Sequence, residues 1–330
     1  MNPLCVRPYQ LMCLFCRLGR QDAHEAYHHE RRLDDIQTAV ARDPVVPISL
    51  RCQTDSEYRY QNPGRDFDTP EGADFNGLRD LCVLRKLGAI PGETRPAVEF
   101  FDLVPTAIPS CAGICAYPAD EAPGWPGCRL AATGNYERGI VRGADAFIHR
   151  QSPAERQTAK VTSCGQCHAA ARLRIRPHHL LCMTCFHKGR SRDELAPIPQ
   201  DNLFECIDII QQNPGIPVEL IAGPCMICPP CTAYHPTANL CIGGKSMGLR
   251  DQKKDLDTLR RLGLRYGDIL PARELLGRLY AAVRSTREVC GCGDGIVRSP
   301  EWDGCGKDGH EDYVKGRAAG LGVPGIPGVT

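Results

Sequence analysis

The sequence lacks an excess of either charge and lacks any long apolar run. Lys and Arg number 40 against 39 Asp and Glu, and the formal net charge is +1. This balance excludes the basic surface of a nucleic-acid-binding protein. No apolar run approaches the roughly 20 residues of a membrane-spanning helix, and "MNPLCVRPYQLMCLFCRLGR" is too broken by polar residues for a signal peptide. The absences predict a cytoplasmic protein with no membrane and no nucleic-acid partner.

Aromatic residues are also scarce, whereas cysteine is abundant. Phe, Trp and Tyr make up 6% of the chain, and 20 of the 330 residues are cysteine. No P-loop is present, and no Rossmann glycine pattern follows a strand, so no nucleotide site is expected. In a reducing compartment clustered thiols are typical metal ligands, and bound metal can supply cohesion that a small aromatic core does not. Cys82 and Cys206, each alone in a helix-like run, are interpreted as small buried hydrophobes.

An internal repeat organises the chain. "VRPYQLMCLFCRLG" at residues 6–19 recurs as "IRPHHLLCMTCFHKG" at residues 175–189, with two cysteines in register. Each copy continues with a helix-like stretch and a strand-like one, "VVPISLRC" or "IPVELIAGPC", that ends on a cysteine. "LRKLG" at 84–88 then answers "LRRLG" at 259–263. An ordered series of matches of this kind predicts two homologous lobes related by internal duplication.

Two further matches extend the repeat. "GLRD" at 77–80 answers "GLRD" at 248–251, and the four-residue difference in their distance to the next match predicts one helix at two lengths, a turn apart. Towards the end of each copy, a pair of cysteines is followed by "GWPGC" or "EWDGC", which contain the only two tryptophans.

The repeat and the local composition predict the domain organisation. We expect an N-terminal lobe over 1–150, a polar linker with a C-x2-C pair over 151–171, a C-terminal lobe over 172–317 and a flexible Gly/Pro-rich tail over 318–330. "ILPARELLGRLYAAV" has helical spacing, and "IPVELIA" is typical of a buried strand. The mixed periods favour an α/β or α+β fold, with a small sheet, helices and cysteine-bearing loops in each lobe.

Pairing the copies gives six matched cysteines in each lobe. In the N-terminal lobe they are Cys13, Cys16, Cys52, Cys111, Cys115 and Cys128. In the C-terminal lobe they are Cys182, Cys185, Cys225, Cys290, Cys292 and Cys305. One interpretation is a four-cysteine [4Fe–4S] cluster per lobe with two cysteines left over. The other is a pair of cubanes bridged by a sulfide, held by three cysteines each.

The densest group of cysteines has no counterpart in the N-terminal lobe. "CMICPPC" contains Cys225, Cys228 and Cys231 in a C-x2-C-x2-C pattern, and Cys241 is the next candidate ligand. This spacing is typical of bacterial ferredoxins, where the chain curls around a [4Fe–4S] cluster. The two prolines make the loop rigid and remove two competing amide donors. The sequence therefore predicts an iron–sulfur cluster here.

Zinc is the alternative metal. "CGQC" with Cys164 and Cys167, and "CMTC" with Cys182 and Cys185, form C-x2-C-x14-C-x2-C, a spacing close to that of a zinc ribbon. Against zinc, the N-terminal lobe keeps "CLFC" without an upstream pair, and the chain has many more cysteines than two tetrahedral sites need. Zinc at Cys164 and Cys167 remains an expectation beside two or more iron–sulfur clusters.

Part of the C-terminal lobe resembles a known family. The run "RIRPHHLLC", then a strand, "ICPPC", one more cysteine and "GLRDQKKDLDTLRRLGL", resembles a small uncharacterised prokaryotic cysteine-motif family that is presumed to bind an iron–sulfur cluster. The resemblance covers about residues 172–270, with Pro177 where the family usually has Gly. It implies four ligands: Cys182, Cys228, Cys231 and Cys241. Because Cys182 also belongs to the repeat's set, we expect more than one cluster in this lobe.

His178 and His179 precede Cys182 directly and are the candidate catalytic residues. A histidine beside a cluster can ligate iron or donate a proton to a substrate, or it can pack and bond to the backbone. The N-terminal lobe has Tyr9 and Gln10 at these positions, so the fold of a lobe does not require the pair. Three further histidines on a polar stretch are expected to be solvated: His24, His28 and His29.

These observations leave three functions open. The first is a cytoplasmic iron–sulfur protein that transfers low-potential electrons to a redox partner protein. The second is an iron–sulfur enzyme, an oxidoreductase with an open cluster site that acts on a small-molecule substrate. The third is a zinc-stapled interaction module.

Overall fold

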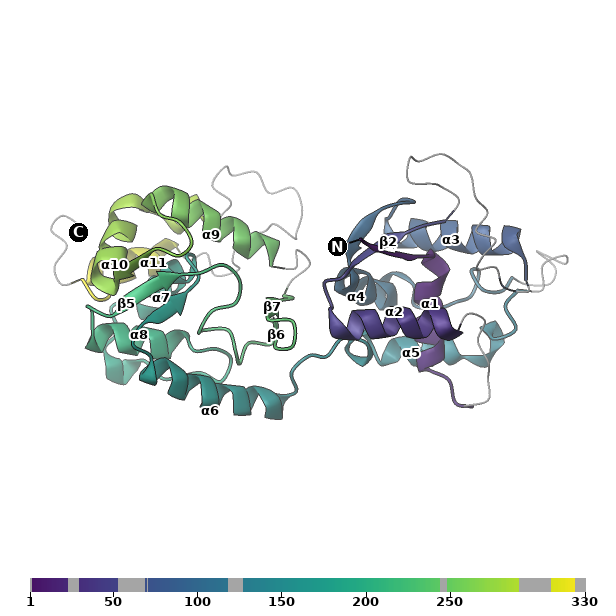
Figure 1. The fold of residues 1–330 in the computed structure, drawn as a ribbon, viewed down its shortest axis with the longest axis horizontal. Coiled ribbons are helices and arrows are strands. Elements are labelled where there is room, and N and C mark those ends of the chain that lie inside the picture. The colour runs from purple at the N-terminus through teal and green to yellow at the C-terminus, as the bar shows by residue number, and fades with distance from the viewer. Residues whose placement is uncertain are drawn as a thin grey trace. The chain divides into compact units, whose positions relative to one another are not determined.

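The computed structural model describes residues 2–22, 30–52, 69, 71–117, 127–243, 248–290 and 310–323. The chain divides into two compact units, unit 1 from Met1 to His149 and unit 2 from Arg150 to Thr330 (Figure 1). Both units combine helices with a small sheet, which confirms the mixed α/β class. Across the described ranges, no helix has both the length and the apolar composition that crossing a bilayer requires.

Unit 1 is built around a three-stranded sheet. In chain order its elements are β1 (Leu4–Val6), α1 (Pro8–Leu18), α2 (Glu30–Arg42), β2 (Pro47–Leu50), α3 (Ala73–Leu87), β3 (Thr94–Pro96), α4 (Ala97–Ala107), the short η2 (Ala131–Thr133), α5 (Asn135–Val141) and η3 (Ala144–Ala146). The sheet order is β1-β2-β3, with β1 parallel and β3 antiparallel to β2. β2 occupies the centre of the sheet, and its residues Ile48, Ser49 and Leu50 are buried.

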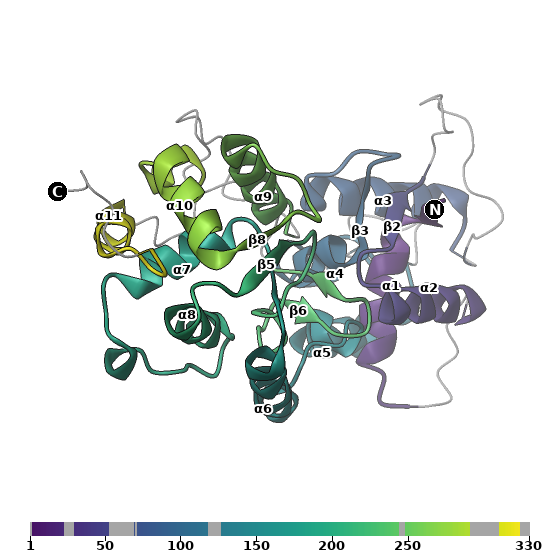
Figure 2. The ribbon, with the colours of Figure 1, turned by 60° about the vertical axis from the view of Figure 1, so that its left-hand side comes forward.

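Unit 2 has the same core order with added elements. These are α6 (Pro153–Ala169), β4 (Leu173–Ile175), α7 (His179–His187), η4 (Arg192–Glu194), α8 (Leu203–Gln212), β5 (Pro217–Leu220), β6 (Tyr234–His235), β7 (Leu240–Cys241), α9 (Leu249–Leu262), β8 (Ile269–Pro271), α10 (Ala272–Ala282), η5 (Thr286–Glu288) and α11 (His310–Ala319). The predicted strand at "IPVELIA" is β5, and the predicted amphipathic helix is α10, whose apolar face is buried. Figure 2 shows α9 and α10 on one side of this sheet and α6 and α8 on the other.

The two sheets share their topology and their register. Sheet β4-β5-β8 repeats the parallel and antiparallel pairings of β1-β2-β3. Leu4 pairs with Ile48 as Leu173 pairs with Val218, and a proline of the central strand faces a proline of the third strand in both sheets. The same order of elements with the same pairing is therefore present twice.

A buried ion pair closes each unit at the same place. Arg7 Nε donates to Asp80 Oδ2 at 2.8 Å, and Arg176 Nε donates to Asp255 Oδ2 at the same distance. The other oxygen of each aspartate accepts an amide hydrogen bond of 3.0 Å from the residue two positions after the arginine. Each aspartate thereby fixes the start of the helix that carries the first cysteine pair.

This geometry corrects one sequence alignment. Asp255 takes the place of Asp80, so "GLRD" at 77–80 corresponds to residues 252–255 rather than to the second "GLRD". The two helices have 15 and 14 residues, and the predicted difference of one turn is wrong. They align through their C-terminal ends, "LRKLG" and "LRRLG", where a glycine in the left-handed conformation terminates each helix.

A glycine allows close helix packing in each unit. A Cβ on Gly139 of α5 would lie 1.7 Å from the Phe15 carbonyl oxygen of α1, and a Cβ on Gly316 of α11 would lie 1.9 Å from the Thr184 carbonyl oxygen of α7. A tyrosine three residues before each glycine donates its hydroxyl to a backbone carbonyl, at 2.7 and 2.9 Å. The contact holds the cysteine-bearing helix against the last helix of its unit.

The segment predicted as a linker contains a helix of unit 2. Pro153–Ala169 form α6, and Ser152 caps it by accepting the Glu155 amide hydrogen at 3.2 Å. Lys160 pairs with Glu205 of α8. Part of the predicted tail is also ordered, because Leu321 is buried, while residues 324–330 lie outside the described residues.

Candidate metal centres

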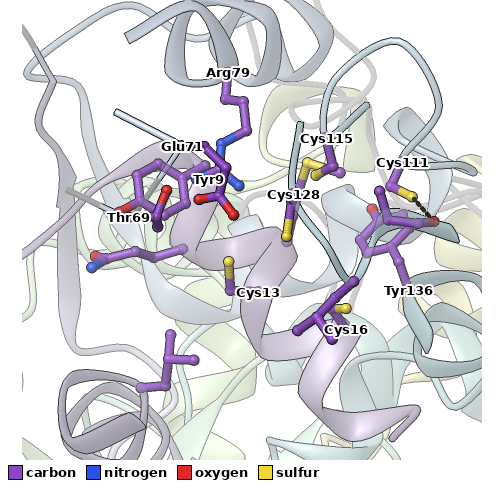
Figure 3. Close-up of a pocket in the computed structure, with 15 residues that line it drawn as sticks. Tyr9, Cys13, Cys16, Thr69, Glu71, Arg79, Cys111, Cys115, Cys128 and Tyr136 are labelled. Carbon is purple, nitrogen blue, oxygen red and sulfur yellow. Dashed lines mark hydrogen bonds between the residues drawn. The ribbon is translucent and has the colours of Figure 1, made fainter. Parts of the chain in front are cut away.

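Unit 1 gathers five of its six predicted cysteine ligands around one cavity. α1 contributes two of them one helical turn apart, the loop after α4 contributes two, and the last precedes η2. The cavity measures about 40 Å³ and includes Cys13, Cys16, Cys111, Cys115 and Cys128 in its lining. Figure 3 shows these cysteines on the lining of one cavity, although their segments lie far apart in the sequence, and the Cys111 thiol donates to the Ala131 carbonyl oxygen at 3.5 Å. The sixth predicted ligand, Cys52, is buried two residues after β2 and does not line the cavity.

The thiols of this cavity surround a space rather than a point. Over the described residues, no three of them lie within 4.8 Å of one another. A tetrahedral zinc ion with Zn–S bonds of about 2.3 Å requires its sulfur ligands about 3.8 Å apart. An iron–sulfur cluster binds each thiolate to a different iron, so its cysteines stand further apart. The residues of the cavity therefore fit a polynuclear cluster better than a single ion.

Arg79 of α3 supplies a buried positive charge to the cavity. Its guanidinium lies over the Tyr9 ring, 4.1 Å from the centroid, and its Nε atom is buried without a hydrogen-bond partner. A hydrogen bond from Cys111, together with the charge of Arg79, holds the pKa of Cys115 below its ordinary value against the effect of burial. Figure 3 shows Arg79 reaching from its helix towards the cysteines. A fixed cation of this kind offsets the negative charge of thiolates in a buried site.

The corresponding cysteines of unit 2 occupy matching positions. Cys182 and Cys185 lie one turn apart on α7, as the first pair does on α1. The Cys290 amide donates to the Thr286 carbonyl at 2.6 Å, as the Cys115 amide donates to the Cys111 carbonyl at 2.9 Å. Cys290 thus corresponds to Cys115, whereas the sequence paired it with Cys111. Cys292 and Cys305 lie outside the described residues.

A second group of donors in unit 2 is more compact. His179 Nδ1 lies 3.1 Å from Cys225 Sγ, and the sulfurs of Cys225 and Cys228 lie 3.9 Å apart. The three ligand atoms all lie within 4.8 Å of one another. β5 and α7 position the group, because the loop that begins after β5 returns to the first turn of α7. In this group the donors converge on one point.

Several cysteine sulfurs accept a backbone hydrogen bond from the residue two positions later. The Ala233 amide donates to Cys231 Sγ at 3.4 Å. Burial raises the pKa of Cys128 and of Cys241, and an equivalent amide bond opposes part of that rise. At Cys225 the hydrogen bonds outweigh burial and leave the pKa below its ordinary value. An amide pointing at sulfur stabilises the thiolate, which is the form that binds metal. The spacing of cysteines in the sequence carries no signal for these amides.

Two further cysteines of unit 2, Cys231 and Cys241, interact electrostatically with Cys228. The negative charge of a Cys228 thiolate contributes to the raised pKa of both Cys231 and Cys241, after the larger effect of burial. β6 and β7 pair Tyr234 with Cys241 and so bring the distant Cys241 back to the loop. Three of the four ligands implied by the family resemblance are therefore neighbours.

The two adjacent histidines have different surroundings. His178 Nδ1 lies 2.7 Å from Asp255 Oδ1, and burial, reinforced by the neighbouring His179, lowers the pKa of His178 to about 4. His178 is therefore neutral at pH 7 and bonded within the ion-pair network. His179, half-buried, reaches the cysteine group instead.

The proposed zinc pair on α6 faces α8. Cys167 hydrogen-bonds the thiol of Cys206, and its sulfur also lies 3.7 Å from the Met226 carbonyl oxygen. Cys206 is fully buried, in agreement with its interpretation as a core residue, and Cys82 is half-buried. Cys164 lies one turn earlier on α6 and is half-buried.

Comparison with protein-family models, with curated proteins and with solved structures finds no match for this chain.

Proposed function

We propose that the protein is an iron–sulfur protein whose unit 1 cavity holds a cluster and which transfers low-potential electrons to a redox partner protein in the cytoplasm. The observation that carries the proposal is the five-cysteine cavity, which cysteines from three separate segments line. A [4Fe–4S] cluster would use four of these thiols and would supply one-electron chemistry. The cysteines hold the cluster, and the surrounding apolar walls exclude water from it.

We further propose that the two units arose by internal duplication and that unit 2 holds a second cluster. The shared element order, sheet register, Arg–Asp ion pair and glycine contact support the duplication. Cys182, Cys185 and Cys290 take the places of three ligands of unit 1, and Cys305 is the expected fourth. Two clusters on one scaffold suit a protein that passes electrons rather than one that transforms a substrate.

Arg79 places a positive charge beside the thiols of the unit 1 centre, and unit 2 differs in this respect. Its pKa is raised by the thiols of Cys13 and Cys115, although burial alone would lower it. In unit 2 the corresponding residue is Lys254, whose ammonium bonds Asp251 at 3.2 Å. Among the described residues, the Arg79 side chain hydrogen-bonds the neutral Asn76. A positive charge beside the thiols stabilises the more negative, reduced state of a nearby centre. We therefore expect the unit 1 cluster to have the higher reduction potential.

The proposal is tested by comparing cysteine variants of anaerobically purified protein. Cys13→Ser and Cys115→Ser each remove one cavity thiol, while Cys5→Ser removes an exposed thiol elsewhere in unit 1 and is the control. We expect both cavity variants to lose iron, acid-labile sulfide and the visible absorption of one cluster, with no loss in the control. A wild-type protein that lacks iron and sulfide, or cavity variants that retain the full content, would refute the proposal.

A further inference from the structure

We propose that His179, Cys225 and Cys228 form a mononuclear site for a soft divalent cation, Zn²⁺ by its choice of donors, separate from the iron–sulfur clusters. One imidazole nitrogen and two thiolates are donors that zinc prefers. The proposal does not depend on the cluster of unit 1, because it uses other residues in the other unit.

The distances within the group match a single ion. The Sγ atoms of Cys225 and Cys228 lie 3.9 Å apart, against about 3.8 Å for two sulfurs on one tetrahedral zinc ion. His179 Nδ1 lies within the same 4.8 Å sphere. The unit 1 cavity has five thiols but no such convergence among its described residues. The separation of the donor atoms therefore distinguishes the single-ion site of unit 2 from the cluster site of unit 1.

The backbone holds these donors in place before any ion binds. The Cys228 amide donates to the Cys225 carbonyl at 2.9 Å, and the Cys231 amide donates to the Cys228 carbonyl at 2.8 Å, so the loop is a pair of consecutive turns. Pro229 and Pro230 restrict the second turn. His179 is the first residue of α7. A site that is already ordered loses little conformational entropy on binding.

Hydrogen bonds hold the two thiols of this group together. The Cys225 amide donates to Cys228 Sγ at 3.3 Å, and the Cys228 thiol donates to Cys225 Sγ at 3.9 Å. This contact fixes the separation of the two sulfurs on which the site depends.

A tetrahedral ion takes one more ligand than this group supplies. The thiols of Cys231 and Cys241 are further candidates, because the charge of a Cys228 thiolate contributes to the raised pKa of both. Unit 1 cannot form the same site, since Gln10 stands where unit 2 has His179. The site accounts for cysteines that the matched clusters leave unused.

The test measures zinc in the full-length protein and in four variants. His179→Gln and Cys225→Ser remove one proposed ligand each. His168→Gln, at an exposed position on α6, and Cys164→Ser, at the earlier zinc candidate, are the matched controls. We expect about one zinc per chain in wild type and in both controls. The two ligand variants should bind zinc at least ~10- to 100-fold more weakly in competition with a chelator.

Cobalt substitution gives an independent readout that does not require a stable variant. Co²⁺ bound to wild-type protein should show the visible bands of a tetrahedral site and sulfur-to-cobalt charge transfer from at least two thiolates. Three results would overturn the proposal. These are full zinc binding by His179→Gln, loss of zinc only in Cys164→Ser, and iron with sulfide rather than zinc disappearing from Cys225→Ser. Because the cluster test counts iron in unit 1 variants, either proposal can fail without the other.

Discussion

The cysteine-lined cavity of unit 1 and the His179 group of unit 2 place similar donors at different separations. In unit 1 the thiols surround a space, whereas in unit 2 two thiols and an imidazole converge on one point. Tyr9 and Gln10, at the start of α1, both line the unit 1 cavity, whereas of the corresponding pair in unit 2 His179 joins the donor group and His178 bonds Asp255. The comparison indicates that the spacing of the donors, rather than the count of cysteines, distinguishes a cluster site from a single-ion site.

The largest expected effect is the loss of bound iron from variants that remove a cluster ligand in one unit or in both. If each unit holds one cluster at matched positions, Cys115→Ser and Cys290→Ser should each remove about half of the bound iron and sulfide. The double variant should contain neither, while its zinc content is unchanged. Metal analysis after anaerobic purification measures all three. Iron that is unaffected by Cys290→Ser would refute a cluster in unit 2.

Both buried ion pairs should stabilise their units, and Asp255 should contribute more than Asp80. Burial raises the pKa of Asp80 to about 6 in spite of Arg7, whereas the hydrogen bond from His178 and the charge of Arg176 outweigh burial and leave the pKa of Asp255 below its ordinary value. Asp80→Asn and Asp255→Asn each leave an arginine buried without its charged partner, which costs about 3–5 kcal/mol. Denaturant unfolding followed in each variant measures the loss, and Asp74→Asn, an exposed carboxylate on α3, is the control. A loss from Asp80→Asn no larger than from the control would show that the pair is not structural.

Substitution of the glycines at the helix contacts should lower stability by a smaller amount, and a third glycine provides a control whose substitution should raise stability. A methyl group on Gly139 or Gly316 would collide with a backbone carbonyl, so each Gly→Ala change should destabilise by about 1–3 kcal/mol. Gly277→Ala on α10 meets nothing within 4 Å and should stabilise by roughly 0.5–1 kcal/mol. Thermal unfolding of the three variants compares them, and a stabilising Gly139→Ala would contradict the close helix contact.

The smallest expected effect concerns Arg79. Arg79→Met removes the cation beside the unit 1 thiols and should lower the reduction potential of that cluster, by an interaction on the order of 1 kcal/mol. Arg79→Lys should restore most of the potential, because it keeps the charge. Redox titration monitored by electron paramagnetic resonance resolves the two clusters. A potential that rises in Arg79→Met would contradict the proposed role of this charge.

The repeat made much of the fold predictable from the sequence. The helix-like stretches that follow the matched motifs are α2 and α8, and the strand-like runs "VVPISLRC" and "IPVELIAGPC" contain the central strands β2 and β5. The helical form of the motifs themselves, α1 and α7, was not predicted. The polar composition of 151–171 suggested a linker, although Ser152 and Glu155 formed a capping box that signals a helix start. In this segment the capping box predicted the structure better than the polar composition did.

The sites were less predictable because they depend on contacts between distant segments. The spacing of the cysteines predicted all five thiols of the unit 1 cavity as metal ligands. It did not predict which cysteines lie at the same cavity, and Cys52, the sixth predicted ligand, does not line it. Arg79 was missed, since an arginine within "GLRD" carries no sequence signal for a buried cation above Tyr9. The pairing of Cys290 with Cys115 needed the backbone bond to Thr286, which the count of residues between cysteines obscured.

The most direct test of the central claim is the content of iron, acid-labile sulfide and zinc in anaerobically purified wild-type protein. Cysteines held at two different spacings predict iron and sulfide in equal amounts, at about four of each per cluster, together with about one zinc per chain. A colourless protein that contains zinc but no sulfide, or one whose thiols all react freely without any metal, would contradict the account.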